Sequence, residues 1–140
     1  MVRISNLKIL NILQDNSRTP FIEIAKRLGV TDTAIRKRIN KMEKLGIIRK
    51  YTVEVDPKKI GYPVDALIGI DTEPEYYISM IERLKDMKII RKLFSSSGDH
   101  MIMMECWFKA SQELRDFVKK LESIQGVTRV CPAIILERIK

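Results

Sequence analysis

Cationic side chains are concentrated in one short stretch of the chain, VTDTAIRKRINKMEKLG, over residues 30–46. Lysine and arginine bind phosphate, arginine pairs with guanine through two hydrogen bonds, and asparagine pairs with adenine in the same way. The whole chain has a net charge of +8, and all of the excess lies in residues 1–62, which hold 14 Lys and Arg against 6 Asp and Glu. Residues 63–140 hold 12 of each. This asymmetry favours a basic module that meets a polyanion, beside a neutral module with another task. A solvated basic surface that aids solubility is the alternative on charge alone.

The other residue types that could do chemistry are sparse. His100 is the only histidine, and at the head of a predicted strand it favours a hydrogen-bonded or exposed side chain over a catalyst. The chain has no paired carboxylates at useful spacing, no P-loop and no GxGxxG motif. Cys106 and Cys131 form no CxxC pattern and are predicted to be free thiols in apolar surroundings. We therefore predict no catalytic residue, no metal site and no cofactor.

Three helical patterns make up the first part of the chain. In NLKILNILQDN, the apolar residues recur at helical spacing and leave Lys8, Asn11 and Gln14 on one side. In RTPFIEIAKRLGV, Thr19 is expected to cap a short helix with Pro20 at its first position, and Gly29 to end it. A third helix is expected from the cap Thr31 to Gly46.

The third helix has a narrow apolar stripe. Ile35, Ile39 and Met42 recur at i, i+4 and i+7, so most of the helix surface is expected to face solvent. Two helices joined by a short turn with a glycine, the second outwardly cationic, form a helix-turn-helix whose second helix enters the major groove. Helix N-termini also hold phosphate. An ordinary amphipathic helix with a solvated cationic side is the alternative. The residues predicted to contact DNA are Arg18, Thr31, Thr33, Arg36, Lys37, Asn40, Lys41 and Lys44.

After Gly46 the apolar period changes to two. IIRKYTVEVDP alternates and predicts a half-buried strand that ends at Pro57, which makes the first module winged or strand-extended. DPKKIGYP supplies turn residues between the two halves. We expect a DNA-binding domain over residues 1–56, a linker over 57–63 and a second domain over 64–140.

The second half alternates between strand and helix patterns. PVDALIGID, IIRKLFS, HMIMMECWF and VTRVCPAIILERI predict strands, and EPEYYISMIERLKDM and SQELRDFVKKLESI predict helices, the latter capped by Ser111. The order β-α-β-β-α-β is that of a ferredoxin-like antiparallel sheet with both helices on one side, so the whole chain is α+β. HMIMMECWF has apolar residues in both alternation classes. The sheet face without helices is therefore expected to pair with another copy.

These residues resemble the leucine-responsive/asparagine-regulator (Lrp/AsnC) family over nearly the whole chain. The resemblance rests on RTP before the second helix, EIAKRLGV, a small polar pair before AIRKRI, and EKLGIIRKYT. It implies a transcription regulator that binds double-stranded DNA, forms a dimer through its regulatory sheets, assembles further into tetramers or octamers, and is tuned by an amino acid or related metabolite.

The resemblance is weakest where an effector would bind. Family members commonly end the turn between the two central strands with aspartate, and this chain has Met101 there, which cannot hold an ammonium group. Asp99 is a substitute for that role, and amides in the glycine-containing turn could receive the carboxylate. An unusual ligand, or none, is the alternative. The predicted effector-binding residues are Ser96, Ser97, Gly98, Asp99 and His100.

The alternatives to a DNA-binding regulator are a decarboxylase and a protein that binds single-stranded RNA. Some relatives of this architecture resemble haem-precursor decarboxylases, but a decarboxylase needs no cationic recognition helix. Single-strand RNA binding needs aromatic side chains among the cations, and the first half has few besides Phe21 and Tyr51. With no stretch of about 18 apolar residues and no signal peptide, the protein is expected to be cytoplasmic, without a membrane partner.

Overall fold

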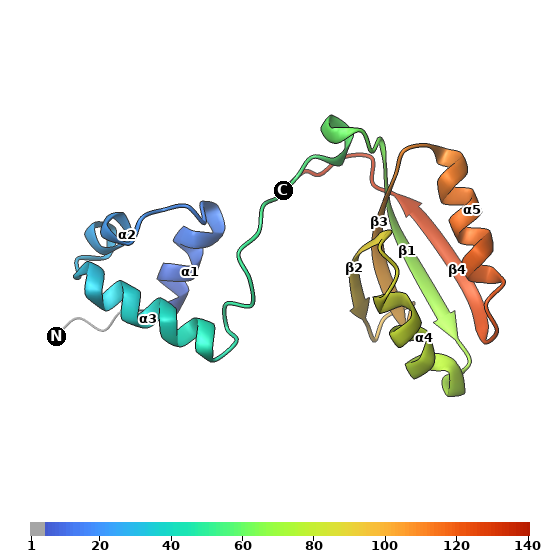
Figure 1. Cartoon of the computed structure of the whole chain (residues 1–140), viewed down its shortest axis with the longest axis horizontal. Helices are drawn as coiled ribbons and strands as arrows, with labels where there is room; N and C mark the ends of the chain where they lie inside the picture. The colour runs from blue at the N-terminus through green and yellow to red at the C-terminus, as the bar shows by residue number, and fades with distance from the viewer. Residues whose placement is uncertain (1–4) are drawn as a thin grey trace. The chain divides into compact units, whose positions relative to one another are not determined.

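The computed structural model describes residues 5–140 and divides the chain into two compact units between Glu54 and Val55. The first unit contains the helices α1 (Asn6–Asp15), α2 (Phe21–Leu28) and α3 (Asp32–Lys44) (Figure 1). Each helix turns its apolar stripe toward the other two. This confirms the three predicted helices, and their shared core consists of Ile9, Leu13, Ile24, Ala25, Ile35, Ile39 and Met42.

The ends of these helices follow the predicted capping chemistry only in part. The Thr31 hydroxyl accepts a hydrogen bond from the Ala34 amide at 3.1 Å, and Gly29 ends α2 with φ +68°, as predicted. The prediction that Thr19 caps α2 is wrong. Its buried hydroxyl donates to the Asn16 carbonyl at 2.7 Å, because the side chain turns back to the preceding turn. Pro20, expected inside the helix, is instead the residue before its first turn.

The strand predicted from IIRKYTVEVDP is absent. Residues 47–56 have no strand pairing anywhere in the described chain, and the side chain of Val53 is 77% exposed. A strand needs a hydrogen-bonded neighbour as well as an alternating pattern, and this segment has none. The Ile47 and Ile48 amides instead donate to the Met42 carbonyl and close the end of α3. Residues 57–63, expected to be a linker, contain the short 3₁₀ helix η1 (Pro57–Ile60).

The second unit is built on a four-stranded antiparallel sheet. Its strands are β1 (Val64–Thr72), β2 (Ile90–Ser95), β3 (Ile102–Phe108) and β4 (Val127–Ile134), in the spatial order β2-β3-β1-β4. The 3₁₀ helix η2 (Pro74–Tyr76) leads into α4 (Tyr77–Lys85) after β1, and α5 (Ser111–Glu122) follows β3. This is the predicted ferredoxin-like α+β arrangement.

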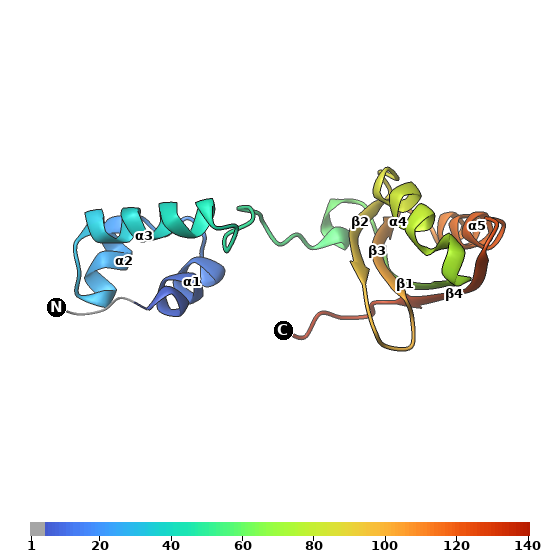
Figure 2. The ribbon, with the colours of Figure 1, turned by 90° about the horizontal axis from the view of Figure 1, so that it is seen from below.

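Both helices of this unit cover the same face of the sheet (Figure 2). Alternate residues of β3, from Ile102 to Phe108, point into the core beneath them, and the Phe108 ring lies 5.8 Å from that of Phe117 on α5. Cys106 is buried there, and burial, with the nearby Glu105 and Asp65 carboxylates, raises the pKa of its thiol to about 12. Both cysteines are free, as predicted, although Cys131 is only half-buried.

Two local expectations in this unit are wrong. Ser111 does not cap α5, since Ala110 precedes the helix and the Glu113 carboxylate instead accepts a hydrogen bond from the Lys109 amide at 3.0 Å. The third strand, expected from His100, begins at Ile102. His100 and Met101 belong to the turn, because the His100 ring and the Met101 amide bond to the side chain of Asp71 at the end of β1 and not to the backbone of that strand.

Candidate DNA interface and effector site

The outward face of α3 is cationic and accessible. Ile35, Ile39 and Met42 are fully buried, and their spacing turns the remaining sides of the helix to solvent. The structure confirms that the selected residues are exposed, and it therefore permits contact with a duplex. Those residues are Thr31, Thr33, Arg36, Lys37, Asn40, Lys41 and Lys44.

The helix N-terminus and the preceding turn add polar groups to this face. The Thr31 hydroxyl accepts the Ala34 amide, so its own hydrogen is left to donate to a phosphate oxygen. Arg18 is exposed in the turn between α1 and α2, where its amide donates to the Asn16 side chain at 3.0 Å. The α2-turn-α3 arrangement is that of a helix-turn-helix.

The cationic side chains of α3 differ in the partners that they contact. Within residues 5–140, none of Arg36, Lys37, Lys41 and Lys44 forms an ion pair with a carboxylate. Unpaired cations are those that can release counterions when they meet phosphate. Arg36 alone has an aromatic partner, because its guanidinium carbon lies 5.1 Å from the centre of the Phe21 ring.

The predicted effector residues form the turn between β2 and β3. The Ser96 amide donates to the Met101 carbonyl at 2.9 Å, and the Ser96 hydroxyl donates to the His100 carbonyl. Ser96 therefore closes the turn, and its amide is not free to receive a ligand. Ser97, Gly98 and Asp99 are exposed at the tip.

Two residues that the sequence analysis did not select hold this turn in place. Asp71, at the end of β1, accepts hydrogen bonds from the ring nitrogen Nδ1 of His100 at 2.9 Å and from the Met101 amide at 3.0 Å. Arg129 on β4 donates to Asp71 at 2.8 Å and to the Asp99 carboxylate at 3.1 Å. Asp71 and Arg129 are direct partners in the strand register. An opposite-charge pair across aligned strands would have been the signal for them.

A glycine makes this arrangement sterically possible. A Cβ at Gly69 would lie 2.4 Å from ring carbons of His100, so the ring packs directly on the backbone of β1. Figure 2 shows the turn between β2 and β3 on the side of the sheet away from the helices. The turn is therefore anchored to the helix-free face.

The charges around Asp71 shift its ionisation. Partial burial pushes the pKa of Asp71 upward, but the hydrogen bonds from His100, the Met101 amide and Arg129 outweigh burial and lower that pKa below its ordinary value. The same contacts with Asp71 and Asp99 raise the pKa of the Arg129 guanidinium. The ionised carboxylate is thus the form that holds the turn.

The opposite end of the helix-free face has a second acidic group, and this one is buried. Asp65 is 3% exposed and Glu105 is 4% exposed, and Arg138 of the C-terminal segment donates to both. Burial and the Asp65 carboxylate raise the pKa of Glu105, against the attraction of Arg138. Beside them, the Arg91 guanidinium lies 4.3 Å from the centre of the Trp107 ring. Sequence reasoning missed this cluster, which joins residues far apart in the chain.

The middle of the same face is apolar. Residues directly opposite each other in the ladders share a face, and around Gly69 they bring together Met103, Phe94 and Cys131. Leu67 and Ala133 continue this surface. Leu67 is 38% exposed and Phe94 is 55% exposed, so an apolar centre lies between two charged ends.

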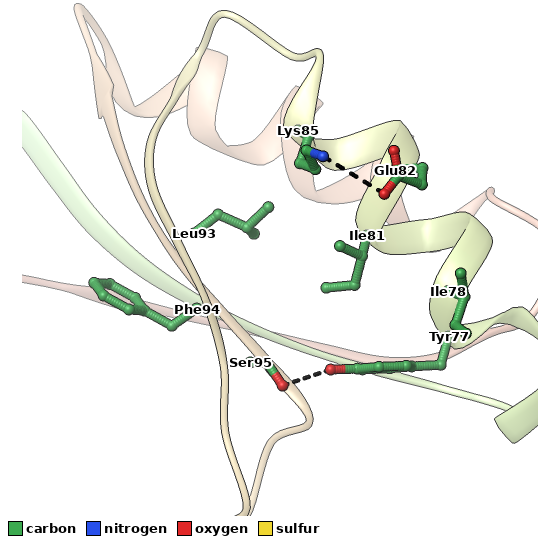
Figure 3. A pocket seen from close by; sticks show the side chains of 8 residues that line it. All are labelled: Tyr77, Ile78, Ile81, Glu82, Lys85, Leu93, Phe94 and Ser95. Carbon is green, nitrogen blue, oxygen red and sulfur yellow. Dashed lines mark hydrogen bonds and ion pairs between the residues drawn. The ribbon is translucent and has the colours of Figure 1, made fainter. Parts of the chain in front are cut away.

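A separate hollow of about 360 Å³ lies between α4 and the edge strand β2 (Figure 3). Tyr77 closes one end by a hydrogen bond with Ser95, and Glu82 and Lys85 pair with each other across 3.5 Å. None of the predicted effector residues lines this hollow. Its lining residues are Tyr77, Ile78, Ile81, Glu82, Lys85, Leu93, Phe94 and Ser95.

Within residues 5–140, no group of three or more His, Cys, Asp or Glu side chains is placed to bind a metal ion. No helix in the same range has the length and apolar character needed to cross a membrane.

We expect Asp71→Asn to lower the free energy of unfolding at pH 7 by about 1–3 kcal/mol, because the His100 ring, the Met101 amide and Arg129 lose a charged acceptor. The folded-state pKa of Asp71 lies below the unfolded value of about 3.9, so the stabilisation by Asp71 is complete above about pH 5 and is lost as the pH falls through the folded pKa. Urea unfolding of the unaltered protein and of Asp71→Asn, at pH 7 and at about pH 3, measures how far the two differ in stability at each pH. The exposed Asp86→Asn is the control, and equal stability of both variants at pH 7 would contradict this role.

Comparison with known proteins agrees with both units. Residues 3–49 match the family of winged helix-turn-helix DNA-binding domains, and residues 65–140 match the Lrp/AsnC ligand binding domain. The HTH-type transcriptional regulator LrpA of Pyrococcus abyssi is 50% identical over 133 residues, which are 94% of each chain.

Solved structures share the fold of the whole chain. AsnC of E. coli is 28% identical, with a TM-score of 0.81 over 99% of this chain and 96% of that one. The regulator NMB0573 of Neisseria meningitidis, solved as a complex with L-Met, is 21% identical with a TM-score of 0.86, over 100% and 93% of the two chains. The relatives are named transcriptional regulators, not enzymes, and the alternative of a haem-precursor decarboxylase is not supported. The chain belongs to the Lrp/AsnC family of DNA-binding transcriptional regulators.

Proposed function

We propose that this regulator binds specific duplex operators as a dimer and that an amino acid or related metabolite modulates the binding. The observation that carries the DNA part is the exposed face of α3, where Arg36, Lys37, Lys41 and Lys44 have no carboxylate partner within residues 5–140. A helix with this surface fits the major groove, where phosphates lie along both walls and base edges line the floor.

The residues of this face divide into two roles. Arg36 and Asn40 are one helical turn apart on the same side of α3, and they contact base edges, because a guanidinium can pair with guanine and an amide with adenine. Thr31, at the N-terminus, donates to phosphate together with its neighbours. The remaining phosphate contacts come from Arg18, Thr33, Lys37, Lys41 and Lys44.

The two roles predict different consequences of substitution. Lys41→Ala should weaken binding to all duplexes and lower the salt slope by about 1 for each bound subunit, since one phosphate contact is lost. Arg36→Ala should relax the preference at one base-pair position by about 1–3 kcal/mol. Binding isotherms over a salt series, on a selected operator and on unrelated DNA, measure both effects. Lys120→Ala on α5 is the control, and identical behaviour of the two α3 variants would contradict the division.

The dimer is proposed to form through the helix-free sheet face. Neither α4 nor α5 covers its apolar centre around Leu67 and Met103, and exposed apolar surface of this kind is typical of interfaces. A two-fold dimer would carry two α3 helices to half-sites about one helical turn apart, so the operators should be roughly palindromic. Tetramers or octamers would require further contacts between such dimers.

We expect Leu67→Lys to convert the dimer into a monomer, because two new charges would be buried at the centre of the interface. Sedimentation velocity measures whether the variant is a dimer or a monomer. Its affinity for a palindromic operator should fall when the dimer is lost. Ile78→Lys places the same charge on the exposed surface of α4 and serves as the matched control. A Leu67→Lys protein that remains dimeric would place the interface elsewhere.

The effector is proposed to bind at the turn between β2 and β3. The related NMB0573 is known as a complex with L-Met, which supports an amino acid as the ligand class. In this chain, the Asp99 carboxylate is the acidic group at the tip and would receive the ammonium group, in exchange for its contact with Arg129. The amides of Ser97 and Gly98 would receive the carboxylate. Met101 contributes only its amide, which Asp71 already holds.

Asp99→Ala should abolish thermal stabilisation by the effector and leave the dimer intact, because Asp99 is 79% exposed and lies at the tip of the turn. Thermal shifts with each of the twenty amino acids measure this, with Asp86→Ala as the control for a lost surface carboxylate. Unchanged stabilisation of the Asp99→Ala protein would reject the assignment. If no amino acid stabilises the unaltered protein, the amino-acid class itself is wrong.

A further inference from the structure

We propose that Phe21 is a specificity-determining residue of the DNA interface, and that it acts by positioning the guanidinium of Arg36. This inference rests on the proposed function of α3. Phe21 is the first residue of α2, and Arg36 lies near the beginning of α3. The contact therefore crosses from one helix of the helix-turn-helix to the other.

The ring of Phe21 is itself held in place. It is half-buried and packs against the core shared by the three helices, so its position depends on the fold of the unit. The Arg36 side chain is exposed, and its Cζ atom lies 5.1 Å from the ring centre. This distance is within the range of cation–π attraction. Within residues 5–140, Arg36 has no carboxylate within 4 Å, so no ion pair competes with the ring.

A guanidinium can contact an aromatic ring and a base at the same time, because it uses different parts of the group for the two contacts. Stacking on an aromatic ring uses the flat face of the group, whereas its hydrogen-bond donors lie in the plane at its edge. The Arg36 Cζ atom lies over the Phe21 ring, and a guanidinium that lies flat there would keep its donors available for the two acceptors of guanine. The ring also limits the rotamers of a long side chain before DNA arrives, which reduces the freedom lost on binding.

The other cations of α3 have no such partner. Among the described residues, no aromatic ring is paired with Lys37, Arg38, Lys41 or Lys44. A mobile ammonium suits phosphate, which has many acceptor oxygens and makes no planar demand, whereas paired hydrogen bonds to guanine require a fixed plane. The contact thus distinguishes Arg36 as a base-contacting group and makes Phe21 part of that function.

The test is a double-mutant cycle read out as sequence preference. Selection from a random duplex pool with the unaltered protein defines the operator and the base pair whose preference Arg36→Ala relaxes. We expect Phe21→Leu to lower the preference at that same base pair by about 2- to 5-fold. Its affinity for unrelated DNA and its salt slope should not change. Phe21→Tyr, which keeps the aromatic face, should retain the preference.

The double variant separates positioning from a general effect on the fold. If Phe21 acts through Arg36, the Phe21→Leu and Arg36→Ala double variant should match Arg36→Ala alone in its preference. Circular dichroism checks folding, and Phe21→Met, which fills a similar volume, replaces the leucine variant if that variant does not fold.

The outcomes distinguish this inference from the function on which it rests. If Arg36→Ala changes the preference and Phe21→Leu does not, or if the two changes add in the double variant, Phe21 is not the positioning residue and the DNA assignment stands. If Arg36→Ala changes no preference, the assignment of Arg36 and the role of Phe21 both fall. Loss of binding to all DNA by Phe21→Leu with a normal fold would also overturn the proposal.

Discussion

The orientation of α3 depends on a narrow apolar contact, and the DNA interface depends on that orientation. Three fully buried side chains at i, i+4 and i+7 attach the helix to α1 and α2, and they occupy only one side of it. The helix cannot rotate without placing charged groups in the core, which is far costlier than exposing them. The same contact therefore holds the helix in the unit and presents its cations to solvent. Function at this surface follows from packing beneath it.

The second unit is organised by a different asymmetry, the covering of one sheet face only. The helix-free face has an apolar centre and carboxylates at each end, where Arg129 pairs with Asp71 and Arg138 pairs with Asp65 and Glu105. Charged ends and an apolar middle restrict how a second copy could pack, since a shifted register would set charges against apolar groups. The proposed effector turn is anchored at one of these ends through Asp71. A ligand that exchanges the partners of Asp99 would therefore act beside the proposed dimer surface.

The sequence predicted what periodicity and composition control, and it failed where contacts between distant residues decide. The helices, the β-α-β-β-α-β order and the exposed cations of α3 follow from spacing alone. The strand predicted over residues 47–56 failed because alternation says nothing about whether a partner strand is present. Thr19 and Ser111 have good capping side chains, but local hydrogen bonds to Asn16 and from Lys109 replaced the expected ones. Asp71 and Arg129 could be found only after the register of β1 and β4 was known.

The sequence could select a set of α3 residues for DNA contact, but it could not rank them. Periodicity places Arg36, Lys37 and Lys41 together on the exposed side, and charge treats them as equal. The structure separates them, because the Arg36 guanidinium lies over an aromatic ring, whereas Lys37 and Lys41 have neither an aromatic nor a carboxylate partner within residues 5–140. A group held in one plane suits a base edge, and a mobile one suits the backbone, whose phosphates are the same at every position. Specificity in such a helix thus depends on the preceding helix as well, since it supplies the surface that holds the base-contacting group.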